Sequence, residues 1–505
     1  MPEYIKALFA IVTIAGFVFL ALTSVGRLPY IEIGDFKRRR NAWLITTCCA
    51  FLLHSFWLLM ICAGIMLGVW RKKEKNAPAL FLWLLSVIPP FSSDISGFGV
   101  VNYLFTLDFP RLLSLTLLLP TAWGLSHRRG RGATPDGFNI VDGLLLSYVL
   151  LRLLHRIPSD TSTNSAREAF YLLIDIGLPY YVASRGLATC EAVGEACVSY
   201  AASMFVMGGI AMFEAARHWL LYKPLPEELG IYWGYGNYLA RGALRAEATS
   251  GQPIVLGFMM VVAISMYLCT LQVPLERLRW ASKAGVLWLL GGLVASLSRG
   301  PWVGAAVAVF VFVASNRAAA KSLMILALTV GAVGALVAIS PWRDDVVSYL
   351  PFVGSVGDEN VEYRRLLIDV TVSVIKQHPW FGSFDYLSLP EMQQLVQGEG
   401  IIDVVNTYIG VALSDGMVGL LLFIGVPTVA AWKTWRAARS PAGAEGATAA
   451  LGRSLLAAII GMVVTIGTTS SVTLIPVIYW TTIGVSIAYV RVMSAENARL
   501  APSRR

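Results

Sequence analysis

The sequence predicts an all-α membrane protein, a polytopic bundle of about 12 to 14 transmembrane helices. Composition and long apolar runs are the two observations behind this prediction. Hydrophobic residues make up 56% of the 505 residues and charged residues only 14%, which leaves too little polar surface for a water-soluble globule. Apolar stretches of about 17 to 25 residues recur along the chain, and each is long enough to cross a hydrocarbon core about 30 Å thick.

Helices rather than strands are expected to cross the membrane. Apolar runs such as residues 305–314 and 455–464 do not alternate with polar residues, as the strands of a membrane β-barrel would. The first run shows no cleavage site typical of a signal peptide, so it is expected to stay in the protein. The expected spans are residues 4–24, 42–69, 78–94, 104–124, 138–155, 169–184, 194–213, 254–272, 283–298, 301–315, 322–340, 404–432, 454–472 and 475–491.

Short basic loops set the expected orientation. The loops at residues 71–75, 128–131, 277–283, 317–321 and 433–453 fall on one side under this count. Because positive residues stay in the cytoplasm, both termini of this multi-pass, inner-membrane type of protein are expected there. The run Lys37-Arg38-Arg39-Arg40 then falls outside. Either the first two helices are drawn incorrectly, which is the preferred explanation, or these charges serve an external anionic ligand.

The charge and cysteine content exclude several classes. The net charge of +9 is spread over the loops on one side, which is typical of membrane topology and does not indicate a nucleic-acid partner. The six cysteines lie in or beside predicted helices and show no metal-ligand spacing, so neither a metal site nor a disulfide framework is implied. No Gly-Lys-Ser/Thr phosphate loop is present, which argues against an ATP-driven pump.

Two long connections interrupt the series of short loops, and both are expected on the outer face. They divide the chain into N-terminal helices (1–213), a first external loop (214–253), further helices (254–340), a large external loop (341–405) and C-terminal helices with a tail (406–505). Long structured loops commonly carry function. The site is therefore expected at the outer membrane surface.

The first external loop combines aromatic and basic residues. Its aromatic residues are Trp219, Tyr222, Tyr232, Trp233, Tyr235 and Tyr238, and its basic pair is Arg241 and Arg245. Aromatic faces stack on sugar rings, and guanidinium groups match phosphate oxygens in a bidentate manner. An interfacial aromatic belt is the alternative. The arginine pair favours function, because positive charge is scarce on the outer side.

Two further external features carry charge. The turn Ser298-Arg299-Gly300-Pro301 places one arginine between two apolar helices, where an anionic partner would offset its cost and where a snorkelling anchor is the alternative. In the large loop, residues 361–377 have apolar residues at helical spacing and predict an amphipathic helix that could lie along the membrane. His378-Pro379-Trp380-Phe381-Gly382 is expected to end this helix.

These residues resemble the O-antigen ligase and Wzy-type polysaccharide polymerase superfamily, and more narrowly its exopolysaccharide polymerase branch. The resemblance rests on motifs in the C-terminal half, whose order and external placement match. The motifs are Arg241-Gly242-Ala243-Leu244-Arg245-Ala246, Gly251-Gln252-Pro253, Ser298-Arg299-Gly300, Arg364-Arg365, His378-Pro379-Trp380-Phe381-Gly382, Asn406-Thr407-Tyr408 and Asp415-Gly416-Met417-Val418-Gly419-Leu420.

The resemblance implies a GT-C-like, metal-independent and cofactor-free enzyme with a long periplasmic loop that contains amphipathic helices. It would transfer an undecaprenyl-diphosphate-linked glycan to a hydroxyl acceptor, and a chain-length-regulating co-polymerase would be a partner. Fixed guanidinium groups would stabilise the charge that develops on the diphosphate leaving group. The expected catalytic residues are Arg241, Arg245, Arg299, Arg364, His378 and Asp403. The expected substrate-binding residues are Arg365, Trp233, Tyr235, Tyr238, Asn406 and Tyr408.

One departure from the family pattern favours a polymerase over a ligase. Ligases carry a histidine immediately before the Asn-x-Tyr element, whereas this chain has Val405. Asp403, Asp385 or His378 remains as an alternative base, although His378 could equally be structural.

Two other classes stay open besides the ligase. A flippase of lipid-linked sugars could use the charges Asp108, Arg152 and Asp175 within or near helices, although pairing inside the bundle is the preferred explanation. A metal-dependent glycosyltransferase could use Asp344 and Asp345 as ligands, but adjacent loop carboxylates are usually solvated, so this alternative is minor.

Overall fold

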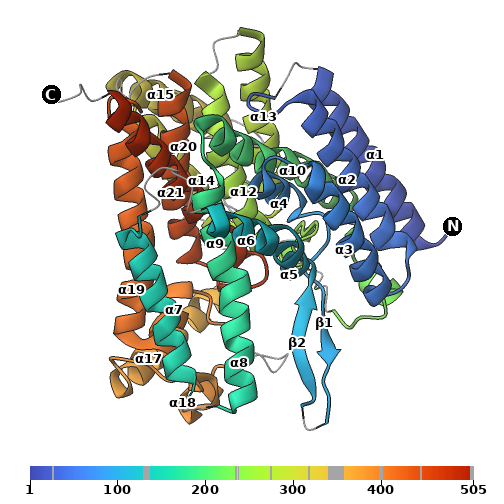
Figure 1. The fold of residues 1–505 in the computed structure, drawn as a ribbon, viewed down its shortest axis with the longest axis vertical. Helices are drawn as coiled ribbons and strands as arrows, with labels where there is room; N and C mark the ends of the chain where they lie inside the picture. The colour runs from blue at the N-terminus through green and yellow to red at the C-terminus, as the bar shows by residue number, and fades with distance from the viewer. Residues whose placement is uncertain are drawn as a thin grey trace.

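The computed structural model describes residues 1–24, 28–99, 101–128, 137–157, 160–233, 236, 238–240, 242–272, 276–316, 319–338, 358–396, 402–443 and 446–500. These residues are mostly helical, which confirms the predicted all-α bundle (Figure 1). The first half of the helices comprises α1 (Glu3–Ser24), α2 (Ile33–Leu52), α3 (Phe56–Lys73), α4 (Ala77–Leu84), α5 (Phe109–Leu113), α6 (Leu119–Arg128), α7 (Ile140–Arg156), α8 (Ser162–Tyr171), α9 (Leu178–Gly186) and α10 (Cys190–Arg217).

The second half follows the hairpin of β3 (Leu239–Ala240) and β4 (Ala243–Leu244). It comprises α12 (Pro253–Tyr267), α13 (Glu276–Ala295), α14 (Arg299–Ala314), α15 (Ala319–Ala338), α17 (Asp358–Gln377), α18 (Pro390–Gln393), α19 (Thr407–Ala438), α20 (Gly446–Ile466) and α21 (Ile475–Leu500). Short helical pieces complete the described chain: η1 (Ser114–Leu118), η2 (Leu172–Gly177), α11 (Leu225–Glu228), η3 (Leu268–Gln272) and η4 (Tyr386–Ser388).

Six of the described helices are long and apolar enough to cross a membrane. They are α1, α10, α12 continued by η3, α19, α20 and α21. Shorter apolar helices cover residues 280–295 and 299–314. The packing around α10 and α12 is dense, since 89% of the residues in the most apolar stretch of each helix are buried. The chain is therefore a multi-pass helical membrane protein with α10 and α12 at its centre.

Small residues allow the helices behind the site to approach closely. A Cβ atom added at Gly304 of α14 would lie 2.1 Å from Thr465 Oγ1 of α20, and one added at Gly461 would lie 2.9 Å from the Ala308 side chain. Such contacts are possible only without side chains at these positions, as is common between membrane helices. They fix the start of α14 against the end of α20.

Two of the expected spans are wrong because the chain turns inside them. Residues 42–69 form two helices, α2 and α3, which are separated at His54, a residue with a left-handed φ of 46°. The first amide of α3, Phe56 N–H, donates instead to the carbonyl of Leu229 at 3.2 Å. Residues 78–94 contain only the eight-residue α4, and Pro89-Pro90, which cannot continue a helix, then lead into a strand.

A β-hairpin replaces the start of the next expected span. Strand β1 (Ser92–Ser96) pairs antiparallel with β2 (Tyr103–Asp108) in a register that sets Ser92 opposite Asp108. The polar residues of this segment, such as Asp94 and Thr106, bond across the hairpin at 2.7 Å. The hairpin projects at the end of the bundle where α17 and α18 also lie (Figure 1).

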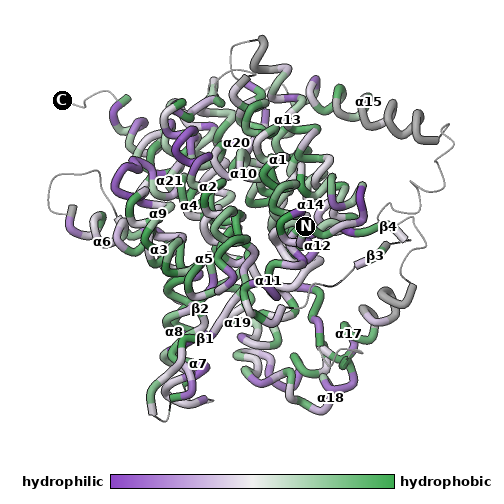
Figure 2. Tube along the Cα trace, turned by 90° about the vertical axis from the view of Figure 1, so that its right-hand side faces the viewer, coloured by the Kyte–Doolittle hydropathy of each residue, from purple (hydrophilic) through white to green (hydrophobic). Residues whose placement is uncertain are grey.

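The second long connection contains, in its described residues, a small domain-like unit with its own core. Leu367, Val370 and Val374 of α17 pack with Met392 and Leu395 around α18, and all five are buried. The expected amphipathic helix is therefore present, and much of its apolar face is covered by protein. Hydrophilic residues gather around α18 at this end of the molecule (Figure 2).

The two termini lie at opposite ends of the bundle. At the end of α10, Trp219 Nε1 donates to the Glu3 carboxylate at 3.2 Å. At the other end, Asn497 Oδ1 accepts from Ala442 N–H at 2.9 Å in the turn between α19 and α20, and Glu496 lies near Cys190 at the start of α10. The described ends of the chain therefore lie at opposite ends of α10, an arrangement that does not support two cytoplasmic termini, and the side of the membrane on which each end lies stays a prediction.

The extra helix accounts for the unexpected position of the basic run. Arg39 is completely buried and its Nη2 lies 2.7 Å from Glu74 Oε1 after α3 and 2.6 Å from Glu195 Oε1 in α10. The run Lys37–Arg40 therefore lies at the same end as the basic residues 71–75. Incorrectly drawn first helices, rather than an external ligand, explain its unexpected position.

Candidate functional site

The first predicted arginine loop folds onto the turn that follows α13. The tight turn between β3 and β4 contains Gly242, whose φ of 79° favours glycine. After β4, Arg245 N–H donates to the Tyr238 carbonyl at 2.9 Å, and Ala246 N–H donates to the Ala295 carbonyl at 3.0 Å. The backbone thus fixes Arg245 beside the end of α13.

The side chain of Arg245 joins the two arginine motifs. Its Nη2 donates to Ser298 Oγ at 2.9 Å, and its Nε donates to the Ser296 carbonyl at 3.4 Å. No carboxylate lies within 4.0 Å of this guanidinium among the described residues, and burial lowers its pKa. We call Arg245, Ser298 and Arg299 the arginine turn. A partly desolvated guanidinium beside a helix start is suited to an anionic ligand.

Arg299 occupies the first position of α14, where the helix dipole is positive. The next residue must be glycine, because a Cβ atom there would lie 1.9 Å from Thr468 Oγ1. Arg245, held by Ser298, therefore lies beside the N-terminus of α14, where Arg299 is the first residue. Pro301 has no N–H group, so the first turn of α14 offers one backbone donor fewer to an anion, and the arginine side chains are the main donors there.

A hydroxyl-rich turn after α20 connects the arginine turn to the start of α19. Ser470 Oγ lies 2.6 Å from Asp403 Oδ1 and 2.7 Å from the Val404 carbonyl. The backbone N–H and side chain of Thr407 donate to the Thr469 carbonyl at 3.0 and 2.7 Å. Asp403 is exposed. Residues 468–470 therefore lie between Asp403, which Ser470 bonds, and Gly300 of the arginine turn's helix, which Thr468 contacts. The sequence analysis had placed these residues inside an apolar span.

Asn406 and Tyr408 hold helices together. Asn406 Oδ1 caps α19 by accepting from the Tyr408 and Ile409 N–H groups at 2.9 and 3.3 Å. The Tyr408 hydroxyl donates to the Val463 carbonyl of α20 at 2.7 Å. Both groups thus support the loop that carries Asp403.

Two buried carboxylates beside the arginine turn were missed by the sequence analysis. Glu214 Oε2 accepts from the N–H groups of Glu247 and Ala248 at 3.1 and 2.8 Å, which ties the loop to α10. Neither side-chain oxygen of the completely buried Glu247 has a hydrogen-bond partner among the described residues. Burial, and then the nearby Glu214, raise the pKa of Glu247 to about 9, so it is neutral near pH 7. The glutamate two residues after Arg245 was the available signal.

The aromatic residues of the loop divide into two groups. Tyr222 is buried, Trp219 bonds Glu3, and the Trp233 ring packs edge-on against Phe91 at 5.3 Å. Tyr232 and Tyr238 are instead 99% and 40% exposed. Among the described aromatic residues of the loop, the second group is the more exposed to a ligand.

His378 belongs to a different structural unit. Gly416 interrupts α19 with φ 67° and ψ −168°, and the His378–Gly382 motif docks there. Met417 N–H donates to the Pro379 carbonyl at 2.9 Å, and Ser383 N–H donates to the Leu413 carbonyl at 2.8 Å. The motif at residues 378–382 and the motif at residues 415–420 therefore pack against each other. The His378 side chain is exposed, and no contact among the described residues joins it to the arginine turn.

The charges considered for a translocation path are paired inside the bundle. Arg111 Nη2 lies 2.9 Å from Asp175, and Asp108 Oδ1 accepts from the Arg111 N–H at 2.8 Å. Arg152 lies 3.5 Å from Glu168 and 3.7 Å from Asp415. The preferred explanation of pairing within the bundle agrees with these contacts.

Several predicted residues lie outside the described part of the chain. These are Arg241, Tyr235, Asp344 and Asp345. Arg364 and Arg365 lie on the described backbone of α17, without a described side chain.

One acidic group among the described residues has the spacing of metal ligands, namely Asp35, Glu74 and Glu195. Arg39 already bonds both glutamates, so the group is a compensated ion-pair network.

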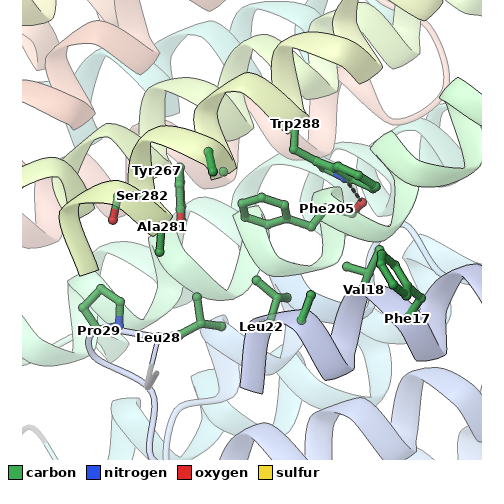
Figure 3. Close-up of a pocket in the computed structure, with 13 residues that line it drawn as sticks. Phe17, Val18, Leu22, Leu28, Pro29, Phe205, Tyr267, Ala281, Ser282 and Trp288 are labelled. Atoms are coloured by element: carbon green, nitrogen blue, oxygen red, sulfur yellow. Dashed lines mark hydrogen bonds between the residues drawn. The ribbon is translucent and has the colours of Figure 1, made fainter. Parts of the chain in front are cut away.

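An apolar pocket lies elsewhere, between α1, α10, the end of α12 and α13. Figure 3 shows Phe17, Leu22, Phe205, Tyr267 and Trp288 around it. None of the predicted site residues lines it. The pocket is thus distinct from the arginine turn.

The fold and the arginine turn define a multi-pass helical membrane protein with a cationic site at one end of the bundle. Comparison with known families matches residues 284–424 to the O-antigen ligase family. A protein named O-antigen ligase from Pseudomonas aeruginosa is 30% identical over 159 residues, which are 31% of this chain and 35% of that protein. The match thus spans about a third of that relative. The resemblance predicted from the motifs is confirmed over residues 284–424, which include Arg299 and the docked motif at Gly416.

Proposed function

We propose that the protein joins oligosaccharide repeat units, carried on undecaprenyl diphosphate, into exopolysaccharide or O-antigen at the periplasmic face of a bacterial inner membrane. The observation that supports this most is the arginine turn, where Arg245 bonds Ser298, the residue directly before Arg299 at the start of α14. The end that holds the residue runs 71–75 and 433–453 would face the cytoplasm, since it is the more basic.

In the proposed reaction an acceptor hydroxyl attacks the anomeric carbon of the donor. The bond from this carbon to the diphosphate oxygen breaks, and its electron pair leaves with the diphosphate. Arg245 and Arg299, together with Arg241 and Arg364, would stabilise the developing charge more than the ground state. Tyr232 and Tyr238 would offer exposed faces to the sugar.

The acceptor proton requires a base. Of the alternatives Asp403, Asp385 and His378, the contacts favour Asp403, because Ser470 links it to the turn that packs against Gly300. A carboxylate 2.6 Å from one hydroxyl can accept a proton from a second. His378 would then support the structure through its docked motif.

A reconstituted assay tests the proposal. The purified protein receives a lipid-linked repeat unit as its sole substrate in excess chelator, and a ladder of longer lipid-linked chains is expected. Asp403→Asn should abolish the ladder, whereas His378→Gln and Asp385→Asn should retain it. A ladder that requires added divalent metal would contradict the metal-independent reaction.

A ligase is the second candidate, and one observation favours it: the similar Pseudomonas aeruginosa protein carries the name O-antigen ligase. A ligase would transfer finished chains onto a separate acceptor. Val405, at the position where ligases carry a histidine, favours the polymerase. A chain-length-regulating co-polymerase would be the expected partner.

A further inference from the structure

A second cationic site lies at the end of the bundle opposite the arginine turn. It is a cavity of about 370 Å³ between the start of α7, the end part of α19 and the end of α21. Lys433, Arg491 and Arg499 line it together with Asn139 and Ser494. We call it the basic pocket. Three basic and no acidic side chains are among its described lining residues, so it attracts anions.

The carboxylate at the start of α7 leaves this attraction intact. Asp142, in the first turn of α7, lies 2.8 Å from Arg185 and accepts from the Tyr180 hydroxyl at 2.7 Å, so its charge is compensated. Asn139 satisfies the first amides of α7 with its own side chain. The helix start is therefore capped, and the basic side chains carry the attraction.

Two tryptophans indicate the depth of the basic pocket in the membrane. Trp432 and Trp435 of α19 are 51% and 38% exposed. The guanidinium groups of Arg436 and Arg439 lie 5.0 and 4.4 Å from the centres of these rings. Exposed tryptophan beside basic residues is typical of the boundary between hydrocarbon and headgroups. Lys433 lies between them in the chain, so the pocket opens at headgroup depth.

The lining is also amphipathic. Ile487 and Val490 line the pocket about two to three turns of α21 before the basic end of the helix at Arg499. An apolar wall next to cationic groups suits a ligand with a charged head and an apolar chain. A free inorganic anion would gain nothing from that wall.

We propose that the basic pocket binds the phosphate headgroup of an anionic phospholipid from the adjacent leaflet. Basic pockets between membrane helices are suited to such headgroups. This inference does not depend on the proposed polymerase activity, since it concerns the opposite end of the bundle. Bound lipid would join α7, α19 and α21 and stabilise the protein.

The experiment measures lipid binding to delipidated, detergent-solubilised protein. Unfolding temperature is recorded against added phosphatidylglycerol, phosphatidylcholine or inorganic phosphate. Phosphatidylglycerol should raise it in a saturable way, and the other two should not. In the double variant Lys433→Gln/Arg499→Gln, binding should weaken about 25-fold, because each basic side chain near an anionic surface contributes about 1 kcal/mol, or about five-fold.

A matched control is available at the same end. Lys72 and Lys73 are exposed at the end of α3 and do not line the pocket, so Lys72→Gln/Lys73→Gln removes the same charge and should bind as the wild type does. Unfolding without lipid shows whether each variant is folded. Equal weakening in both double variants, or equal protection by phosphatidylcholine, would overturn the proposal. Equal protection by inorganic phosphate would show a free-anion site instead.

Discussion

At the scale of single residues, Arg245 connects the two arginine motifs. It reaches across from one loop to bond Ser298 and the Ser296 carbonyl, and these contacts use only part of its five donors. In the proposed reaction the remaining donors would bind the diphosphate. A lysine at this position would keep the charge but lose the planar group that bonds two oxygens.

We predict that Arg245→Lys inserts normally but loses most polymer formation. If the bidentate contact contributes about 2 to 4 kcal/mol in the transition state, turnover falls roughly 30-fold to 1000-fold. The assay is chain growth from lipid-linked repeats. Arg217, exposed at the end of α10, is the control and should tolerate lysine. Wild-type rates for both Arg245→Lys and Arg245→Ala would refute this role of Arg245.

Glu247 makes stability depend on pH. Its pKa is raised to about 9 because burial and the nearby Glu214 outweigh Arg245 and Lys223, whereas an unfolded glutamate has a pKa of about 4.3. Between these values the folded state retains a proton that the unfolded state releases, so stability falls as pH rises.

We therefore predict that Glu247→Gln raises the unfolding temperature at pH 8 and reduces its decline between pH 6 and pH 9. Thermal unfolding of the detergent-solubilised protein over this range measures the effect. Glu227→Gln, a change at an exposed position in α11, should leave the pH profile unchanged. Parallel profiles for wild type and Glu247→Gln would contradict the protonated state of Glu247.

At the scale of elements, the break in α19 connects two distant motifs. Gly416 has a backbone conformation that essentially only glycine adopts. A Cβ atom there would lie 2.4 Å from the backbone of Trp380 and Phe381. The amides freed by the break are satisfied by the carbonyls of Pro379 and Trp380.

We predict that Gly416→Ala separates the two motifs and destabilises the protein by about 1 to 3 kcal/mol or more. Lower unfolding temperature and increased proteolysis after Trp380, which is already exposed, are the expected readouts. Gly410→Ala is the matched control in the same helix, since nothing lies within 4 Å of a Cβ atom there. Equal stability of the two variants would show that the docked motif is unimportant for folding.

The sequence predicted long apolar helices better than the turns between them. The starts of α1, α12 and α21 lie within one residue of their expected starts, because unbroken apolar runs specify them. The break at His54 was missed because apolar residues lie on both sides of it, and the structure shows it by the left-handed φ of His54 and by the contact of Phe56 with Leu229. The periodicity and length of apolar runs cannot reveal a turn that depends on contacts with residues distant in the sequence.

The site shows the same limit. Arg245 and Arg299 were found because charge in an apolar context is unusual, and the structure brings their motifs together through Ser298. Glu247 was missed because a single acidic residue in a loop normally lies in water, whereas tertiary packing buries this one. The four polar residues at 468–471 indicated the end of α20, but the predicted span continued through them.

At the scale of the whole molecule, topology is testable with cysteine labelling in a cysteine-free background. Ser388 in η4 is exposed at the same end of the bundle as the arginine turn, and Lys72 is exposed at the opposite end of the bundle. Ser388→Cys should react with an impermeant maleimide in intact spheroplasts, and Lys72→Cys only after lysis. Pro2→Cys should react as Ser388→Cys does, because Glu3 bonds Trp219. Labelling of Pro2→Cys only after lysis would contradict the opposed termini.

The protein is proposed to join lipid-linked repeat units at the arginine turn. The most direct measurement is the set of lipid-linked glycans that accumulate in a strain lacking the protein, resolved by mass spectrometry and by leaflet. We expect single repeat units on undecaprenyl diphosphate in the outer leaflet, and reintroduced Arg245→Lys should leave them accumulated. Completed but unattached chains would indicate a ligase, and intermediates held in the cytoplasmic leaflet would indicate a flippase; either result would contradict the polymerase.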